Sequence, residues 1–260
     1  MDDGRILVER EDGVTIVRIA REAKRNALTP AMIAAYSQAL ADYDADDEAR
    51  CALVLAEGPH FTAGLDLARA AEVWDAGGTL YPPHLPHICD IREPFRRKPL
   101  VMGVQGICFT FGVELMLAAD VVVAASDCRF AVLEVTRGIM ASAGATCRLP
   151  QVAGWSNAMR YLLTGDEFGA AEAHRMGLVQ EVVEPGRQGD AALAIARRIA
   201  ANAPLAVAAT RANARLAEAE GAAAAVARFD EVRAALRATE DAAEGLASFR
   251  ERRQARFTGR

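Results

Sequence analysis

Short apolar runs recur along this chain and constrain its fold more than any other feature. They cover residues 52–56, 100–104, 121–125 and 130–133, and each is too short for a typical helix. Helical or turn-rich stretches separate them. Strands that alternate with helices are typical of an α/β protein whose sheet is covered by helices. We therefore expect an α/β fold with a buried sheet.

The N-terminal segment predicts a hairpin followed by a helix. Residues 6–10 and 14–20 are rich in β-branched residues and flank the turn residues 11–13. Thr29 and Pro30 form a typical helix start, because the hydroxyl can cap free N–H groups and proline suits the first turn. Apolar side chains then recur at helical spacing and should face the core: Met32, Ile33, Tyr36, Leu40 and Tyr43.

From Gln188 onward the pattern changes to long alanine-rich segments with charged residues, which predict helices. We expect residues 1–190 to form the core and residues 191–260 to form a C-terminal helical region. Its surplus of small apolar faces suggests packing between subunits.

Charge and hydropathy argue against several classes of function. The net charge of −5 argues against a nucleic-acid partner, which usually requires a basic face. No 18 apolar residues run together uninterrupted, so no membrane span is expected. The start, MDDGRILVER, carries acidic residues where a signal peptide has basic ones, which favours a cytoplasmic location.

Cysteine and histidine spacing indicates neither disulfides nor a metal site. The five cysteines are odd in number and widely spaced, which favours reduced thiols: Cys51, Cys89, Cys108, Cys128 and Cys147. His84 and His87 lie three residues apart with no third ligand nearby, so a solvated loop is the better interpretation.

Three segments carry candidate chemistry, and the first is FTAGLDL, residues 61–67. Gly64 lies where a strand-like stretch gives way to a helix, and a glycine there can turn the next N–H outward toward an anion. The alternative is an ordinary helix start in which Asp66 complements the helix dipole. Taken alone, the segment favours that alternative.

The second segment covers residues 104–120. It predicts a strand ending near Gln105, a turn over residues 108–112 and a helix from about Val113. Glu114 then lies near the helix N-terminus among apolar neighbours. It either complements the helix dipole or, because burial raises the pKa of a carboxyl group, serves as an acid or base.

The third segment contains Glu134, which follows the apolar run 130–133. If Glu114 and Glu134 meet in one pocket, their repulsion allows one to be neutral while the other is ionised. Alternatively, Glu134 forms a structural ion pair with Arg137 or Arg148. The spacing favours neither interpretation.

In this order and spacing, the segments resemble the crotonase superfamily, also called the enoyl-CoA hydratase/isomerase family. The resemblance spans nearly the whole chain and includes KRNAL (24–28), FTAGLDL, the QG and GVEL motifs before and at Glu114, FAVLEVTRGIMASAG (130–144), LLTGDEFGAAEAHRMGLVQEVV (162–183) and EGLASFRERRQARFTGR (244–260). It implies a crotonase-like spiral core of ββα units with the acyl-CoA site, and a C-terminal helical region that builds trimers, commonly stacked as hexamers.

The resemblance also implies a reaction. The backbone N–H groups of Leu65 and Phe111 would bind the thioester oxygen of an acyl-coenzyme A, and loss of one such donor typically costs ~10²- to ~10³-fold in rate. Family hydratases use two glutamates, which match Glu114 as the base for water and Glu134 as the proton donor. Water would add to a 2-enoyl-CoA to give a 3-hydroxyacyl-CoA.

Coenzyme A recognition is implied for two short segments. The residues concerned are Lys24, Arg25, Ala27, Ala63, Gly64, Leu65, Asp66 and Leu67. Lys24 and Arg25 can supply positive charge for the phosphates, and the alternative for both is a solvated turn. Coenzyme A belongs to the substrate, so no separate cofactor and no metal are implied.

Two departures from the family pattern leave the reaction open. Thr110-Phe111-Gly112 replaces a glycine-rich run, and Ala141-Ser142 replaces Pro-Gly. Another acyl-CoA reaction is therefore an alternative: double-bond isomerisation, thioester hydrolysis or decarboxylation. A third hypothesis is that the protein binds acyl-CoA without catalysing a reaction.

Residues 74–86, WDAGGTLYPPHLP, break every periodicity. A long irregular loop inside a compact fold is usually functional or poorly ordered. We expect this loop, with Trp74, Leu80, Tyr81 and His84, to border the acyl pocket.

Overall fold

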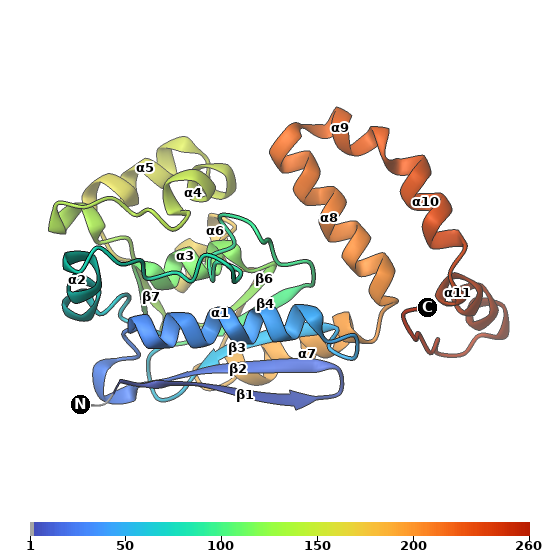
Figure 1. The fold of residues 1–260 in the computed structure, drawn as a ribbon, viewed down its shortest axis with the longest axis horizontal. Coiled ribbons are helices and arrows are strands. Elements are labelled where there is room, and N and C mark those ends of the chain that lie inside the picture. The colour runs from blue at the N-terminus through green and yellow to red at the C-terminus, as the bar shows by residue number, and fades with distance from the viewer. Residues whose placement is uncertain (1–2) are drawn as a thin grey trace.

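The computed structural model describes residues 3–260 and shows a body built on two sheets, with a group of C-terminal helices standing beside it (Figure 1). The strands are β1 (Arg5–Glu11), β2 (Val14–Ala20), β3 (Cys51–Ala56), β4 (Leu100–Val104), β5 (Ile107–Phe109), β6 (Val121–Ala125), β7 (Arg129–Ala131), β8 (Phe168–Gly169) and β9 (Glu181–Val183). The expected α/β class is confirmed.

The helices follow the strands in an alternating order along the body. They are α1 (Pro30–Ala45), α2 (Leu67–Asp75), α3 (Phe111–Ala118), α4 (Ala145–Ala153), α5 (Trp155–Thr164), α6 (Ala170–Arg175), α7 (Gln188–Ala200), α8 (Pro204–Glu220), α9 (Ala222–Ala227), α10 (Phe229–Arg237) and α11 (Glu240–Glu251), with the 3-10 helices η1 (Glu22–Lys24) and η2 (Glu134–Arg137).

The larger sheet has the strand order β1-β2-β3-β4-β6-β9. β1 and β2 form the expected antiparallel hairpin, and the remaining pairs are parallel. The smaller sheet has the order β5-β7-β8, in which β5 and β7 are parallel. In both sheets the parallel strands end at the same edge, so the loops that follow them are brought together.

Both faces of the inner strands β3, β4 and β6 of the larger sheet are buried, which explains their continuous apolar runs. Every residue of β3 is buried. Cys51, Leu53 and Leu55 pack on the face covered by α7, together with Ala192 and Ala196. The alternating residues of β3 belong to the main core on the other face, where α1 lies.

The start of α1 agrees with the prediction. Thr29 Oγ1 accepts a hydrogen bond from Met32 N at 3.2 Å, and Pro30 is the first helical residue. The five predicted core side chains of this helix are all buried.

Three local predictions were wrong. The predicted turn over residues 108–112 contains β5, because residues 107–109 pair with β7, and α3 begins at Phe111 instead of near Val113. Trp74 lies on α2, so the irregular stretch begins only at Ala76. His87 is buried and not in a solvated loop: its Nδ1 accepts a hydrogen bond from Cys89 N at 3.0 Å.

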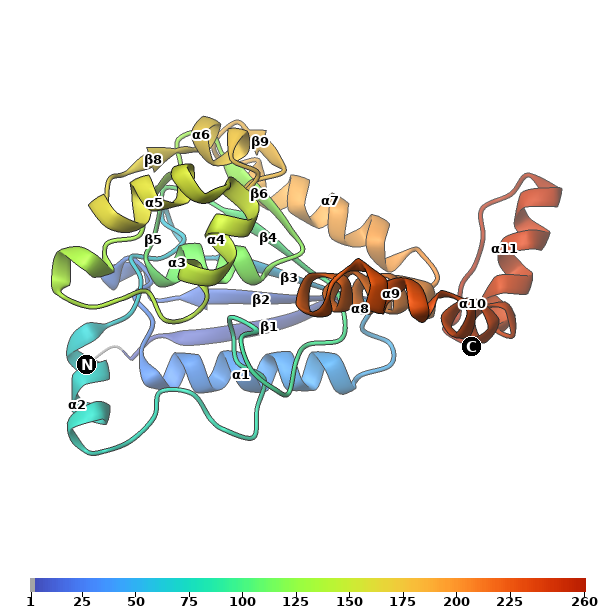
Figure 2. The same ribbon diagram turned by 90° about the horizontal axis from the view of Figure 1, so that it is seen from above.

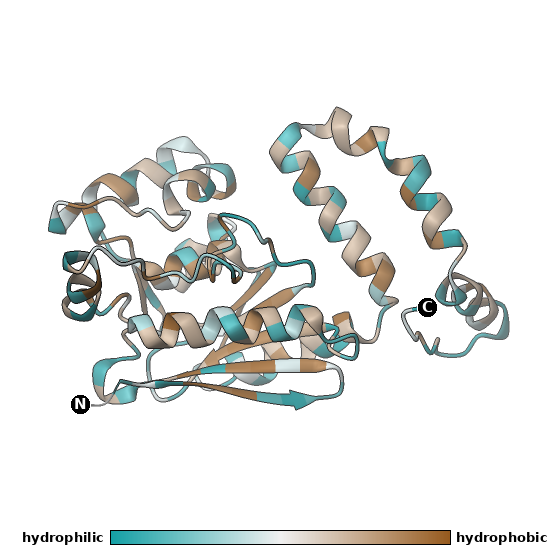
Figure 3. Ribbon diagram, viewed as in Figure 1, coloured by the Kyte–Doolittle hydropathy of each residue, from teal (hydrophilic) through white to brown (hydrophobic). Residues whose placement is uncertain are grey.

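Helices α8–α11 stand away from the sheets, as the view from above shows most clearly (Figure 2). The strands are mostly hydrophobic, whereas hydrophobic and hydrophilic residues are mixed on these helices (Figure 3). Several large apolar side chains on them are exposed: Leu205, Val226, Phe229, Leu246 and Phe249. The expected boundary after residue 190 falls within α7, and the division into two domains stays a prediction.

Within residues 3–260, no single helix is long and apolar enough to cross a membrane, although α7 and α8 meet that criterion together as a pair bent by 105°. All five cysteines are free thiols, four of them buried.

Candidate active site

A cavity of about 350 Å³ brings together the four residues predicted to be catalytic. Leu65, Phe111, Glu114 and Glu134 all line it. Leu65 precedes α2, Phe111 and Glu114 open α3, and Glu134 opens η2 after β7. Segments that are far apart in the sequence meet here because β5 and β7 are parallel neighbours, and a bridge between Thr62 and Cys108 joins the segment before Leu65 to β5.

The backbone N–H group of Leu65 points toward open space. Its neighbours are bound to Leu28: Leu28 N donates to Gly64 O at 2.8 Å, and Asp66 N donates to Leu28 O at 2.9 Å. Because a trans peptide holds N–H and C=O on opposite sides, the N–H of Leu65 points away from Leu28. It makes no hydrogen bond to any of residues 3–260.

The N–H group of Phe111 is similarly free. Thr110 O accepts hydrogen bonds from Val113 N and Glu114 N, so the N–H of the same peptide group points away from α3. It has no partner within the described part of the chain. The two donor segments are adjacent, because Phe109 N donates to Thr62 O at 3.0 Å. Both donor residues, Leu65 and Phe111, line the same cavity.

Glu114 is buried, with 2% of its surface exposed. Its Oε1 accepts hydrogen bonds from Ala143 N at 2.7 Å and Ala145 N at 3.1 Å. Burial raises the pKa of Glu114 to about 7; the negative charge of Glu134 acts in the same direction, and the two N–H donors oppose it. The two carboxyl groups thus interact, and Glu114 can exchange a proton near neutral pH.

Glu134 is half-buried, and its Oε2 is enclosed without a hydrogen-bond partner among residues 3–260. Burial raises the pKa of this carboxyl as well. Within residues 3–260, Glu134 forms an ion pair with neither Arg137 nor Arg148. Arg148 donates instead to Cys89 O and Asp90 O, both at 2.6 Å. Arg137 lines the cavity and has no carboxylate partner among these residues. The second carboxyl is therefore free to act on a ligand.

The walls of the cavity are mainly apolar. Leu67, Trp74, Ile139 and Met140 line it, and all four are more than 40% exposed. Of the four residues expected to border the pocket, Trp74 and Tyr81 line this cavity, whereas Leu80 and His84 do not. Exposed apolar side chains around a concave site favour an apolar ligand group.

Aromatic packing accounts for the side chain of Phe111. Its ring is buried beside that of Tyr81, with 6.2 Å between the centroids, and Tyr81 packs on His87 at 4.1 Å. The bulky residue in the family's glycine-rich turn therefore forms part of the cavity wall and leaves its own N–H free.

The two segments expected to bind coenzyme A lie side by side. Ala63 N donates to Arg25 O at 2.8 Å, and Lys24 and Arg25 are exposed. Asp66 serves the fold: its carboxylate pairs with the buried Arg21 at 2.8 Å and caps α2 through Arg69 N. The Asp66 side chain is thus occupied by contacts within the fold, whereas Lys24 and Arg25 are exposed to solvent.

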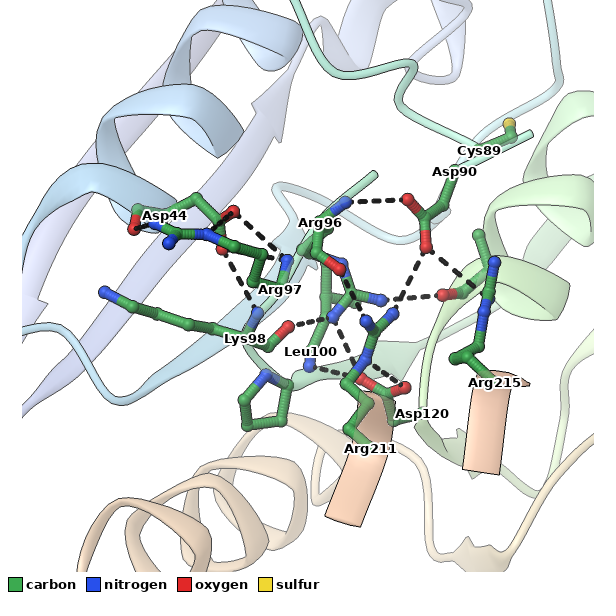
Figure 4. A network of polar contacts seen from close by, with 12 residues as sticks. Asp44, Cys89, Asp90, Arg96, Arg97, Lys98, Leu100, Asp120, Arg211 and Arg215 are labelled. Atoms are coloured by element: carbon green, nitrogen blue, oxygen red, sulfur yellow. Dashed lines mark hydrogen bonds and ion pairs between the residues drawn. The ribbon is translucent and has the colours of Figure 1, made fainter. Parts of the chain in front are cut away.

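A buried polar network supports the opposite end of α3 (Figure 4). Arg96 donates to Ala118 O at 2.9 Å, at the end of the helix that carries Glu114, and pairs with Asp120 at 2.9 Å. Arg211 of α8 pairs with Asp120 at 2.9 Å and with the buried Asp90 at 3.2 Å. The network joins the C-terminal helices to the elements behind the cavity.

The two backbone N–H groups that donate hydrogen bonds to Glu114 were not predicted from the sequence. The N–H groups of Ala143 and Ala145 lie where α4 begins, and free N–H groups at a helix start readily bind a carboxylate. The run of small residues before α4 was the available signal, because it permits a close approach of the backbone.

Comparisons with known proteins show similarity along nearly the whole chain. The sequence profile of the enoyl-CoA hydratase/isomerase family matches residues 9–260. The 2,3-dehydroadipyl-CoA hydratase of Escherichia coli K12 is 33% identical over 98% of this chain and 99% of its own.

Solved structures share the fold. A probable enoyl-CoA hydratase/isomerase from Mycobacterium abscessus is 45% identical, with a TM-score of 0.95 over 98% of both chains. An enoyl-CoA hydratase from Mycobacterium tuberculosis H37Rv is 36% identical, with a TM-score of 0.88 over 98% of this chain and 99% of its own.

Proposed function

The chain belongs to the enoyl-CoA hydratase/isomerase family, the crotonase superfamily, and we propose that it adds water across the double bond of a 2-enoyl-CoA to give a 3-hydroxyacyl-CoA. One observation carries the proposal: two interacting carboxyl groups and two backbone N–H groups line one cavity, and within residues 3–260 the former have no ion-pair partner and the latter no acceptor. Relatives named as hydratases support it, among them the 2,3-dehydroadipyl-CoA hydratase and the (E)-benzylidenesuccinyl-CoA hydratase of Thauera aromatica.

The thioester oxygen accepts hydrogen bonds from the N–H groups of Leu65 and Phe111 in this proposal. Attack at Cβ moves the electrons of the double bond toward this oxygen, which becomes an enolate. Fixed donors stabilise such a charge without reorganisation at the moment of reaction. The N-terminus of α3 adds a favourable partial positive charge.

The water molecule binds between the two carboxyl groups. Glu114 removes a proton from it as the oxygen–Cβ bond forms, and Glu134 delivers its proton to Cα. The hydrogen bonds from Ala143 and Ala145 support this division of roles, because N–H donors favour the ionised form of Glu114 and oppose burial, which raises its pKa to about 7. Because Glu134 gives a proton and Glu114 receives one, the pair of carboxyl groups must hold one proton at the start of each turnover.

The remaining proposals concern binding and assembly. Lys24 and Arg25 bind the phosphates of coenzyme A, and the apolar walls formed by Trp74 and Met140 receive the acyl chain. Helices α8–α11 pack between subunits in a homotrimer or a hexamer made of two trimers, which would cover exposed apolar residues such as Phe249. Sedimentation equilibrium of the purified protein tests this assembly.

We place the protein in the cytoplasm. Its five free cysteines suit a reducing compartment, and four of them are buried. Fractionation of cells with an antibody to the protein tests this location.

The decisive assay follows the loss of enoyl-thioester absorbance with crotonyl-CoA and with longer and aromatic 2-enoyl-CoA substrates. We expect hydration by the wild type and its loss in Glu114→Gln and Glu134→Gln, while both variants still bind coenzyme A thioesters. Glu220→Gln, an exposed glutamate at the end of α8, is the matched control. Isomer formation, thioester hydrolysis or decarboxylation without a 3-hydroxy product would reject hydration, and tight binding without any turnover would indicate a non-catalytic binding protein.

A further inference from the structure

We propose that the hydroxyl of Thr110 is a third hydrogen-bond donor to the thioester oxygen, beside the backbone N–H groups of Leu65 and Phe111. The inference rests on the proposed binding of an acyl-CoA thioester. It goes beyond the two backbone donors, because it assigns a side chain of this chain to the same oxygen.

The hydroxyl of Thr110 makes no hydrogen bond to any of residues 3–260. Thr110 is the N-cap residue of α3, where a threonine normally accepts a hydrogen bond from the first turn. Thr29 and Thr239 do so at the starts of α1 and α11. Thr110 makes no such bond, and its Oγ1 has no partner among residues 3–260. The Oγ1 atom is not among the enclosed polar atoms, so it keeps some accessible surface, and Thr110 lines the cavity.

The backbone of Thr110 explains why its side chain turns away from the helix. Its φ is 50° and its ψ is −111°, which is a true outlier for a β-branched residue. Thr110 N donates to Ala131 O at 2.6 Å, and its carbonyl accepts from α3, so both sides of the residue are held. Strained residues of this kind cluster at functional sites, where the surrounding structure maintains them.

Thr110 Oγ1 lies against the segment that carries the other donor. A Cβ atom added to Gly64 would lie 1.8 Å from Thr110 Oγ1, so the hydroxyl occupies the space beside Gly64. Gly64 directly precedes Leu65, and Thr110 directly precedes Phe111. The hydroxyl therefore belongs to the residue before Phe111 and lies beside the residue before Leu65.

This position suits a donor to an enolate. An enolate oxygen has three lone pairs and can accept three hydrogen bonds, whereas two backbone donors satisfy only two. A hydroxyl hydrogen rotates to suit its acceptor, so Thr110 can donate when the charge develops. Its contribution should increase from the thioester ground state to the enolate, which affects kcat more than KM.

The test uses two substitutions at Thr110 and one control. Thr110→Val keeps the β-branched shape and removes the hydroxyl, and Thr110→Ser keeps the hydroxyl. Thr210→Val makes the same change at an exposed site on α8. We expect Thr110→Val to lower kcat for hydration at least ~10-fold, with a much smaller change in KM. This loss is smaller than the ~10²- to ~10³-fold loss that removal of an oxyanion-hole donor typically causes. Thr110→Ser should recover most of this loss.

A second readout does not depend on hydration. Butanoyl-CoA has no double bond to hydrate, so the infrared C=O stretch of the bound thioester reports only the hydrogen bonds to its oxygen. We expect this frequency to move toward that of free thioester in Thr110→Val and to stay near the wild-type value in Thr110→Ser. If no variant hydrates but the frequency shifts as expected, the proposed reaction fails and the donor role stands. Unchanged frequency and kcat in Thr110→Val, or equal losses in both variants, would overturn the role of the hydroxyl.

Discussion

The Oε1 atom of Glu114 accepts a 2.7 Å hydrogen bond from the backbone N–H of Ala143, which lies 29 residues further along the chain. This bond joins the start of α3 to the start of α4 and fixes one oxygen of a buried carboxyl group. The protonation of Glu114 is thereby linked to the stability of both elements.

The first prediction concerns this linkage. Burial raises the pKa of Glu114 from 4.5 to about 7, so the folded protein holds a proton that the unfolded chain has released. The stabilising effect is complete below pH 4.5 and is lost as the pH rises through about 7. Between these values, the unfolding free energy of the wild type should fall by ~3 kcal/mol more than that of Glu114→Gln. Urea unfolding across this range measures it, and parallel curves for the two proteins would contradict it.

The second prediction separates two arginines that could have paired with Glu134. Arg148→Met removes hydrogen bonds to two carbonyl groups, Cys89 O and Asp90 O, and should lower the unfolding free energy by ~2–4 kcal/mol. Arg137→Met should change it by less than ~0.5 kcal/mol, because Arg137 is exposed and has no ion pair within the described residues. Equal losses in the two variants, measured by urea unfolding, would mean that Arg137 has a structural partner.

The fold was predictable where hydrophobic patterning is strong. The four apolar runs correspond to β3, β4, β6 and β7, and the helical pattern after Thr29 corresponds to α1. β5, β8 and β9 are two or three residues long, and so short a segment has no readable period. Their existence depends on pairing with distant strands, which a local pattern does not contain.

The candidate site was predictable where side chains carry the signal. Glu114 and Glu134 were identified by type and neighbourhood, and the structure brings them to one cavity. The N–H groups that hold Glu114 belong to alanines, whose side chains reveal nothing of a backbone hydrogen bond. The hydroxyl of Thr110 was missed for another reason: its backbone conformation decides where it points.

The third prediction concerns the network behind the site (Figure 4). Arg211→Met removes ion pairs with Asp90 and Asp120. Asp90 keeps its contacts with Arg215 and with the N–H of Arg96, and Asp120 keeps those with Arg96 and with the N–H of Leu100. Because Asp90 is buried, we expect a loss of ~2–4 kcal/mol in unfolding free energy. Arg228→Met breaks an exposed pair with Glu231 and should cost less than ~1 kcal/mol. A smaller loss for Arg211→Met than for this control would contradict the prediction.

The last prediction concerns the side chain of Phe111. Phe111→Ala keeps the backbone N–H and removes a ring that lines the cavity beside Tyr81. The cavity should therefore admit bulkier acyl groups. A few extra contacts between an enzyme and one of two competing substrates change the ratio of their kcat/KM values by about 10-fold or more. We expect the ratio of kcat/KM for cinnamoyl-CoA to that for crotonyl-CoA to rise about 10-fold.

The unfolding free energy of Phe111→Ala should be about 3 kcal/mol lower than that of the wild type. This value is at the low end of the range for replacing a buried phenylalanine by alanine, because the ring borders a cavity that water can enter. Phe95→Ala is the control, since Phe95 is 46% exposed and does not line this cavity. Its substrate ratio should equal that of the wild type. If Phe111→Ala also leaves the ratio unchanged, the ring does not limit the size of the acyl group. The exposed apolar side chains that line the cavity, such as Trp74 and Met140, would then determine which acyl group binds.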